Sequence, residues 1–332
     1  MRIAVITSSY PSSLDDPSGH FVRSETTEMA RSGARVTVLA PGRGPASDHG
    51  ANPRVIWIRD AQAFGWPGAL ARIRRHPWRA LGAAWYCWAA RRAVLKYGPF
   101  DRLIAHWIVP NGWPLVFGLP GQIEVVAHGS DVRLLARLPS VIRRAIVGGM
   151  LDRGVTFRFV SRQLRTILAD VTFPELVELG RVTPCLIDVP PIGRETARRS
   201  IGLRPDELWI IVVGRLVPSK RVDVALRAAR LVPRAKVALV GDGPERPRLQ
   251  RDFGGVRFLG HLSRPDTLTW LAAADLLISS SREEGAPTAV REARALGTPV
   301  VACSSGDLPD WSPDDPDLHL VGSQSPIGRG GP

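Results

Sequence analysis

The segment from residue 276 to residue 301 constrains the fold of this chain more than any other part of its sequence. An apolar run ending at Ile278 predicts a buried strand, and Gly285 and Pro287 then break the chain in a tight loop. A helical pattern follows and stops at Gly297, before a second apolar run. The order strand, loop, helix, strand predicts a parallel α/β sheet, with a loop and a helix N-terminus at the end of a strand.

Two carboxylates flank this loop. Glu284 lies just before the helix, and Glu292 lies eight residues later, about two turns into it. Loop amides and a helix N-terminus bind anions, and carboxylates on either side can accept hydrogen bonds from hydroxyl groups. A phosphate flanked by hydroxyl groups describes a nucleotide sugar. The alternative is a solvated helix with scattered glutamates, because two glutamates at a given spacing are common.

The segment resembles the E-x7-E motif of the retaining glycosyltransferases of the GT-B fold, in the GT4-like family. The residues that carry the resemblance are Glu284 to Thr288, Glu292 with Ala293, and Gly297 to Ala302. The resemblance implies that Glu284 is catalytic and holds the donor sugar, and that Glu292 holds the ribose. It also implies a donor-binding loop that includes Gly285, Pro287 and Thr288.

Further candidates follow other predicted strands, where parallel sheets place their ligands. The sequence HGSDV, which begins at His128, closely resembles a family motif and implies a catalytic histidine beside the transferred sugar. The resemblance implies that Arg215 and Lys220 neutralise the donor diphosphate. It also implies that Gly19 lets backbone approach the donor phosphates or the acceptor, and that the backbone at Gly260 meets the base. The structural alternatives are a buried histidine without a catalytic role and two solvated cations.

The domain organisation follows from length and pattern. A strand–helix–strand opening predicts a doubly wound parallel sheet, and 332 residues are enough for two domains. We expect an acceptor-side domain over residues 1–188, a shortened nucleotide-sugar-binding domain over 189–322, and a disordered tail over 323–332. The resemblance implies a GT-B fold of the α/β class, in which two Rossmann-like doubly wound parallel-sheet domains face a cleft.

The segment after Cys303 departs from the family pattern, which has a Gly-Gly loop and several more helices there. Its proline- and glycine-rich composition predicts loops, so we expect the strands around Val212 and Val300 to be partly exposed. The pair Asp315 and Asp317 mimics a metal-binding D-x-D pattern. Its place in a proline-rich segment predicts solvated side chains instead.

Together these features predict a metal-independent glycosyltransferase that moves a sugar from a nucleotide-sugar donor to an acceptor hydroxyl, with retention of configuration. We expect no metal and no cofactor, because Arg215, Lys220 and a helix N-terminus can neutralise the leaving group. A lipid-linked or polysaccharide precursor fits as the acceptor. Two alternatives stay open: a truncated homologue that binds nucleotide sugar without turnover, and a sugar-nucleotide epimerase of the same fold.

Residues 61–98 form a basic and aromatic stretch without an acidic residue. Its seven cations and four tryptophans are Arg72, Arg74, Arg75, Arg79, Arg91, Arg92, Lys96, Trp66, Trp78, Trp85 and Trp88. Leu81, Trp85, Trp88 and Leu95 share one helical face. This pattern predicts contact of residues 66–96 with an anionic membrane. The alternative is a face that packs on the sheet. Because no recognition motif accompanies the charge, we expect no nucleic-acid partner.

The net charge, the hydropathy and the cysteines indicate where in the cell the protein is expected. The net charge is +13, and residues 1–188 carry 24 Lys and Arg against 14 Asp and Glu, which favours anionic partners. No apolar run reaches transmembrane length, and the first residues resemble a strand rather than a signal peptide. Cys87, Cys185 and Cys303 match no zinc or disulfide framework. We expect a cytoplasmic protein, peripheral at the inner face of the membrane.

Overall fold

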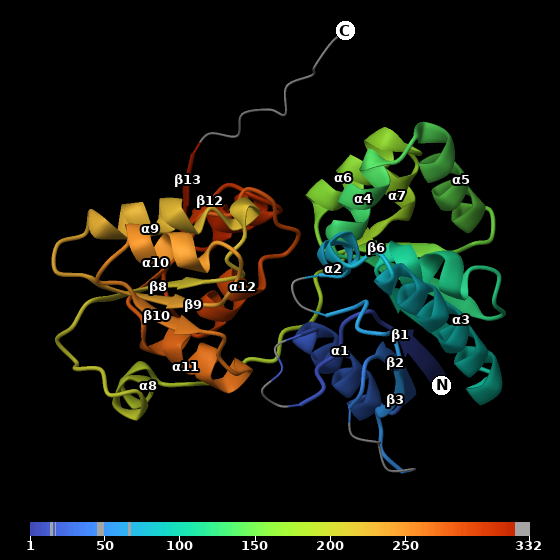
Figure 1. Cartoon of the computed structure of the whole chain (residues 1–332), viewed down its shortest axis with the longest axis horizontal. Helices are drawn as coiled ribbons and strands as arrows, with labels where there is room; N and C mark the ends of the chain where they lie inside the picture. The colour runs from blue at the N-terminus through green and yellow to red at the C-terminus, as the bar shows by residue number, and fades with distance from the viewer. Residues whose placement is uncertain (14–15, 17, 45–49, 66–67, 323–332) are drawn as a thin grey trace, which may run out of the picture. The chain divides into compact units, whose positions relative to one another are not determined.

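The computed structural model describes residues 1–13, 16, 18–44, 50–65 and 68–322. The chain divides into two compact units, Met1–Asp188 and Val189–Pro332, and each has its own sheet (Figure 1). The tail expected to be disordered, 323–332, lies outside the described residues, as does Trp66. None of the described helices combines the length and the apolar character needed to cross a bilayer.

The first unit has a parallel sheet of seven described strands in the order β3-β2-β1-β4-β5-β6-β7. These strands are β1 (Arg2–Ile6), β2 (Arg35–Pro41), β3 (Arg54–Ile58), β4 (Arg102–His106), β5 (Gln122–Ala127), β6 (Thr156–Phe159) and β7 (Arg181–Val182). The helices are α1 (His20–Arg31), α2 (Ala69–Arg75), α3 (Arg79–Tyr97), the irregular η1 (Ile108–Val116), α4 (Ser130–Arg137), α5 (Ser140–Leu151), α6 (Arg162–Val171) and α7 (Leu176–Leu179). Ile3 to Ile6 are all buried, as expected for a strand with both faces covered.

The strand order of the first unit reverses between β1 and β4, which pair in parallel with Val5 opposite Ile104. Such a reversal is the point where doubly wound sheets place ligands, beyond the carboxyl ends of the strands. The chain leaves β1 into the loop that precedes Gly19, and it leaves β4 at His106. The loop before Gly19 and the segment after His106 therefore start from the same end of the sheet, at its point of reversal.

The second unit has a parallel sheet of six described strands in the order β10-β9-β8-β11-β12-β13. These strands are β8 (Trp209–Val213), β9 (Lys236–Val240), β10 (Arg257–Gly260), β11 (Leu276–Ser279), β12 (Val300–Cys303) and β13 (Leu318–Val321). The helices are α8 (Arg194–Ser200), η2 (Pro218–Lys220), α9 (Val222–Arg230), α10 (Arg246–Asp252), α11 (Arg264–Ala273), α12 (Thr288–Ala295), α13 (Leu308–Trp311) and η3 (Ser312–Asp314).

Alternate residues of β8 build the two cores of this unit. Ile210 and Val212 pack with α9 and α10 on one face of the sheet, and Ile211 packs with α11 and α12 on the other. Figure 1 shows α9 and α10 above the strands and α11 below them. The strand order reverses between β8 and β11, so the loops that follow these two strands share the ligand-binding edge.

The segment after Cys303 is more ordered than its composition predicts. It forms α13, η3 and β13, and β13 extends the sheet by pairing with β12. Val212 is 4% exposed and Val300 is fully buried, so the expectation that their strands are partly exposed is wrong. The reason is that a strand of only four residues, set among Asp and Pro, gives a weak sequence signal but completes the sheet.

The D-x-D pair is not simply solvated, which corrects a second expectation. Arg294 of α12 donates two hydrogen bonds of 2.7 Å to the carboxylate of Asp315, and its guanidinium also lies 3.2 Å from Asp317. The Arg294 contact lowers the pKa of Asp315. The first aspartate therefore joins α12 to the segment that leads into β13.

A buried ion cluster holds α1 against the sheet of the first unit. Arg158 of β6 pairs with Glu25 of α1 and, at 3.0 Å, with Glu124 of β5. All three side chains are at most 11% exposed. Since an unpaired buried charge is costly, this cluster fixes the helix that follows the Gly19 loop.

Candidate functional site

The loops after β8 and β11 meet through one ion pair. Lys220, at the end of η2, donates a hydrogen bond from Nζ to the carboxylate of Glu284. The Ser280 hydroxyl donates to the backbone carbonyls of Lys220, at 3.0 Å, and Arg221, at 2.7 Å. The two side chains are 24% and 15% exposed, so the pair is partly open to solvent. The structure thus brings together two of the residues assigned to the donor from the sequence.

Glu292 is more deeply buried than Glu284, the other carboxylate of the motif. It is 4% exposed on α12, and its carboxylate accepts a hydrogen bond from Arg264 at the start of α11. Sequence reasoning missed Arg264. The signal available for it was Ser263, whose side chain caps α11 by accepting from the amide of Asp266 at 3.2 Å. That cap fixes the first residue of α11, where Arg264 sits.

The glycine-rich and proline-rich turns of the second unit are shaped by close backbone approach. Gly260 has φ +69°, a conformation that favours glycine, and its carbonyl accepts from the amide of Gly241 at 2.7 Å. Gly285 is buried, and a Cβ added to Gly306 would lie 2.3 Å from its carbonyl oxygen. The loop after β12 therefore packs directly on the donor loop predicted from the sequence.

The remaining predicted donor residues lie at the same edge. Pro287 precedes the first residue of α12, and Thr288 is that first residue. Arg215 follows β8 and is exposed, five positions before Lys220. An exposed cation and a partly buried one therefore follow β8, and the second reaches Glu284 in the loop before α12. This arrangement is suited to a diphosphate.

Gly19 has a structural role of its own. It precedes α1 with φ +64°, and a Cβ at this position would lie 2.2 Å from the backbone oxygen of Ser9. Any other residue would therefore displace the loop that follows β1. This packing accounts for a glycine here without any ligand, so its predicted contact with donor or acceptor stays a prediction.

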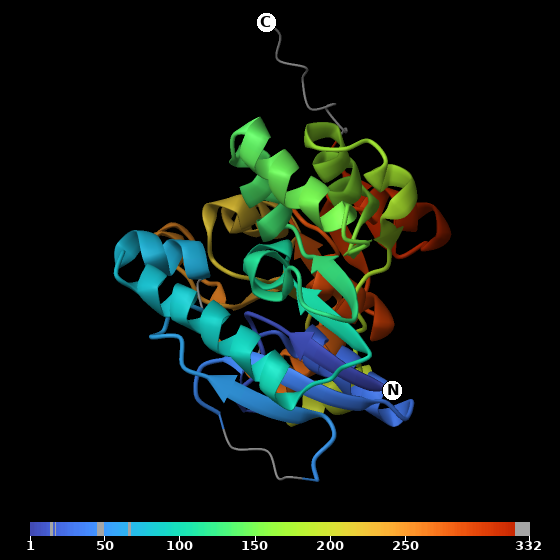
Figure 2. The same ribbon diagram turned by 90° about the vertical axis from the view of Figure 1, so that its right-hand side faces the viewer.

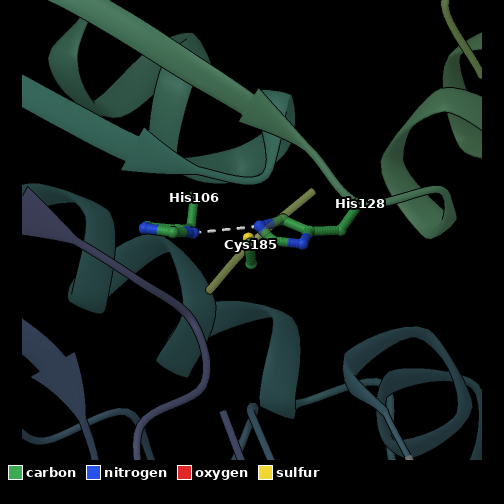
Figure 3. Close-up of side chains that lie close together, drawn as sticks. All are labelled: His106, His128 and Cys185. Carbon is green, nitrogen blue, oxygen red and sulfur yellow. Dashed lines mark hydrogen bonds between the residues drawn. The ribbon is translucent and has the colours of Figure 1, made fainter. Parts of the chain in front are cut away.

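In the first unit, two histidines at neighbouring strand ends contact each other. Nδ1 of His106, the last residue of β4, lies 3.0 Å from Nε2 of His128, the residue after β5 (Figure 3). Asp131 accepts hydrogen bonds from the backbone amides of Ile108, at 2.8 Å, and His128, at 3.1 Å. The predicted catalytic histidine is thus held by a second imidazole and by a turn that a buried carboxylate closes.

Burial keeps both imidazoles neutral. It lowers the pKa of His106 well below its ordinary value, and it lowers the pKa of His128 to about 3, with a smaller contribution from the charge of Arg158. Among the described residues, Nε2 of His106 is buried without a hydrogen-bond partner. In a neutral imidazole one ring nitrogen donates and the other accepts, so the contact between Nδ1 of His106 and Nε2 of His128 is a single hydrogen bond.

Cys185 completes a compact cluster with these histidines (Figure 3). The sulfur and one nitrogen from each ring lie within 4.8 Å of one another, and two imidazoles with a thiol are ligands that zinc accepts. The 3.0 Å between the ring nitrogens is, however, shorter than the roughly 3.3 Å that two tetrahedral zinc ligands require. The pair is therefore a hydrogen bond in this geometry.

Aromatic rings surround His128. The Trp107 ring centroid lies 4.5 Å from that of His128, and the Phe21 centroid lies 5.0 Å from it. Trp107 has φ +72°, a strained conformation for a bulky residue. Such strain persists only where the surroundings enforce it, and it is common beside functional groups. His106 and Trp107 directly follow a predicted strand, which was the signal that could identify them.

The sequence of this chain is similar to those of known glycosyltransferases. The family described as "Glycosyl transferases group 1" matches residues 207–326, which include β8 to β13. The D-inositol 3-phosphate glycosyltransferase of Mycobacterium leprae is 34% identical over 325 residues, covering 87% of this chain and 72% of the relative. A match of 34% identity to the enzyme of the same description from Mycobacterium marinum covers 41% of this chain and only 34% of that relative.

A solved structure extends the likeness to the fold. Sucrose-phosphate synthase from Thermosynechococcus elongatus superposes with a TM-score of 0.75 at 19% identity, covering 98% of this chain and 86% of that one. The fold expected from the sequence is confirmed, with two Rossmann-like parallel-sheet units. The chain belongs to the group 1 glycosyltransferases, the GT4-like family of the GT-B fold.

Proposed function

We propose that this protein transfers a sugar from a nucleotide sugar to an acceptor hydroxyl with retention of anomeric configuration. The single observation that carries the proposal is the contact of Lys220 with Glu284 at the point where the strand order of the second sheet reverses. A cation for phosphate and a carboxylate for hydroxyl groups lie side by side there. Glu292, the fifth residue of α12, adds the second carboxylate expected for a ribose.

The chemistry assigned to these residues is charge neutralisation and positioning. As the nucleoside diphosphate leaves, Lys220 and Arg215 stabilise its developing charge together with the first amides of α12. Binding of the donor moves Lys220 from Glu284 to the phosphate and leaves the carboxylate to hold a sugar hydroxyl. These groups can supply the stabilisation that a metal gives in other transferases, so we propose transfer without a metal or cofactor.

The acceptor class follows from charge. The first 188 residues carry a net +10, which favours an anionic acceptor. The relative named D-inositol 3-phosphate glycosyltransferase bears an anionic compound in its name. A phosphorylated or lipid-linked hydroxyl compound, or an anionic polysaccharide precursor, is therefore the proposed acceptor. His128, neutral and fixed by His106, is proposed to lie beside the transferred sugar.

The proposed location is the cytoplasm, where the thiols of Cys87, Cys185 and Cys303 would stay reduced. This location also supplies nucleotide sugars and phosphorylated acceptors.

The test begins with the donor. Thermal shift against UDP-, GDP-, ADP- and dTDP-sugars identifies the base and sugar, because a ligand that binds the folded state raises Tm. The identified donor, radiolabelled in its sugar, is then incubated with phosphorylated and lipid-linked hydroxyl compounds. Labelled glycoside supports transfer. Donor binding without product under all acceptors, or conversion of the donor to an epimer, would reject the proposal in favour of the other two candidates.

A further inference from the structure

Helix α3 and the residue before it carry an exposed row of large apolar side chains, here called the α3 stripe. Its members are Trp78, Leu81, Trp85, Trp88 and Leu95, which are 57%, 76%, 54%, 49% and 58% exposed. Their spacing of three, four, three and seven residues places them along one side of the helix. Figure 2 shows α3 along the outside of the first unit. An exposed apolar row of this length marks an interaction surface.

The opposite side of α3 is what attaches it to the first unit. Gly82, Tyr86, Ala90 and Val94 are buried, and the Tyr86 hydroxyl donates to the carbonyl of Thr7 at 2.8 Å. A Cβ added to Gly82 would lie 2.3 Å from the carbonyl oxygen of Asp60. The helix therefore cannot roll to bury the stripe. The alternative in which the tryptophan face packs on the sheet is wrong, because the small residues on the other side pack there.

The charges that α2 and α3 themselves carry are all of one sign. The sequence from residue 61 to residue 98 contains no acidic residue. Arg92 lies over the ring of Trp88 at 5.0 Å, so its guanidinium stays beside the stripe. Arg74, Arg75 and Lys96 are exposed on α2 and α3. Arg91 is different, since it donates to the carbonyls of Leu115 and Phe117 and belongs to the packing.

Amphipathic indoles flanked by arginine and lysine match the boundary of a lipid bilayer. Trp rings are enriched at the headgroup level, leucine side chains enter the acyl region, and cations bind anionic headgroups. We propose that the α3 stripe, with Arg74, Arg75, Arg92 and Lys96, docks this protein on the surface of a bilayer that contains anionic lipid. The helix lies in the plane of the interface and does not span it. This surface acts independently of the sugar transfer proposed above.

The experiment is co-sedimentation of the full chain with vesicles, without any nucleotide sugar. Wild-type protein is expected to bind phosphatidylcholine vesicles that contain 30% phosphatidylglycerol, and to release them as salt rises, because salt screens surface charge. Since each cation near such a surface contributes about fivefold in affinity, the variant Arg74→Gln/Arg75→Gln/Arg92→Gln/Lys96→Gln is expected to bind several hundredfold more weakly. The variant Trp85→Gln/Trp88→Gln is expected to lose binding at all salt concentrations.

Two matched variants test whether the location of these residues matters. Arg199→Gln/Arg227→Gln/Arg230→Gln/Arg251→Gln removes four exposed cations from the second unit, and Leu231→Gln removes an exposed leucine there. Both are expected to bind like the wild type, and thermal melts confirm that every variant is folded. Equal binding to neutral and anionic vesicles, no binding by the wild type, or equal losses in the two sets of variants would overturn the proposal. So would self-association without vesicles that Trp85→Gln/Trp88→Gln abolishes, because the stripe would then bind a second copy.

Discussion

Lys220 and Glu284 are 64 residues apart in the sequence, yet the ammonium of one donates a hydrogen bond to the carboxylate of the other. The contact arises because their loops follow β8 and β11, which are adjacent at the reversal of the strand order. Each charge is neutralised by the other. The proposed function requires the diphosphate to bind Lys220 and the sugar to bind Glu284 in place of this contact.

Replacing Lys220 tests the phosphate side of this contact. Lys220→Met is expected to reduce kcat/KM by two to three orders of magnitude. This fall corresponds to about 3 kcal/mol of lost transition-state stabilisation, since a single electrostatic donor to a developing charge is removed. Tm is expected to change little, because the pair is partly solvated. Lys236→Met is the matched control, as Lys236 also pairs with a carboxylate, that of Glu207. Equal activity of the two variants would remove Lys220 from the site.

Replacing Glu284 separates sugar binding from diphosphate binding. Glu284→Gln is expected to abolish transfer while it maintains or raises the affinity for the nucleoside diphosphate alone. The reason is that Lys220 loses its competing carboxylate and the site loses a negative charge. Titration calorimetry with the diphosphate and with the intact donor measures both. A parallel loss of affinity for the two ligands would show that Glu284 supports the loop instead of the sugar.

Arg264 is expected to matter chiefly through Glu292. The Arg264 side chain is 17% exposed and that of Glu292 is 6% exposed, so Arg264→Met removes a charged partner of a buried carboxylate. We expect the free energy of unfolding to fall by about 3 kcal/mol, measured by urea titration. Adding Glu292→Gln should recover part of this loss, because the buried negative charge that Arg264 compensated is then removed. Without such recovery, the effect of Arg264 would lie elsewhere.

The contacting histidines His106 and His128 predict a pH dependence of stability. The folded state keeps His106 and His128 neutral, the latter with a pKa of about 3, whereas unfolded histidine titrates near pH 6.5. The folded pKa values are lowered, so this stability is fully present above pH 6.5 and is lost as the pH falls toward them. At pH 5 the loss is expected to be about 2 kcal/mol for His128, and His106 adds a loss in the same direction.

The corresponding measurement is urea unfolding between pH 7 and pH 5. His106→Gln/His128→Gln should flatten the fall in the free energy of unfolding, and His261→Gln, at an exposed position, should leave the slope unchanged. If the double variant keeps the wild-type slope, the two imidazoles do not stay neutral in the folded protein.

The last described strand depends on one arginine. Asp315→Asn removes the charge that Arg294 binds bidentately, and we expect a loss of about 1 kcal/mol, because both side chains are partly exposed. Asp314→Asn, at an exposed neighbour, is the control. Hydrogen exchange of the β13 amides should accelerate in the first variant only. Equal exchange rates in both would show that the arginine does not stabilise β13.

Much of the second unit could be predicted, because its signals are local. The apolar run of β11, the breaks at Gly285 and Pro287 and the helix that starts at Thr288 follow one another in the sequence, and the structure has them in that order. The position of Lys220 at the ligand-binding end of the sheet could also be predicted, because Lys220 lies in the loop that follows a strand. Local patterns of this kind suffice to place a site, because parallel sheets bind ligands at the carboxyl ends of the strands where the strand order reverses.

The contacts that could not be predicted join distant segments. The pairing of Arg264 with Glu292 depends on how α11 packs beside α12, and the His106–His128 contact depends on β4 and β5 being neighbours. The order of residues 304–322 was missed because β13 is short, with only Leu318 fully buried among its four residues. Its stability comes from pairing with β12, which no local pattern encodes.

The most direct test of the central claim is the anomeric configuration of the product. The donor identified by thermal shift and a working acceptor are incubated with the full chain, and proton NMR of the glycoside reports the configuration at the transferred carbon. The account predicts the configuration of the donor, together with a loss of product of two to three orders of magnitude in Lys220→Met. An inverted product, or undiminished transfer by Lys220→Met, would contradict it.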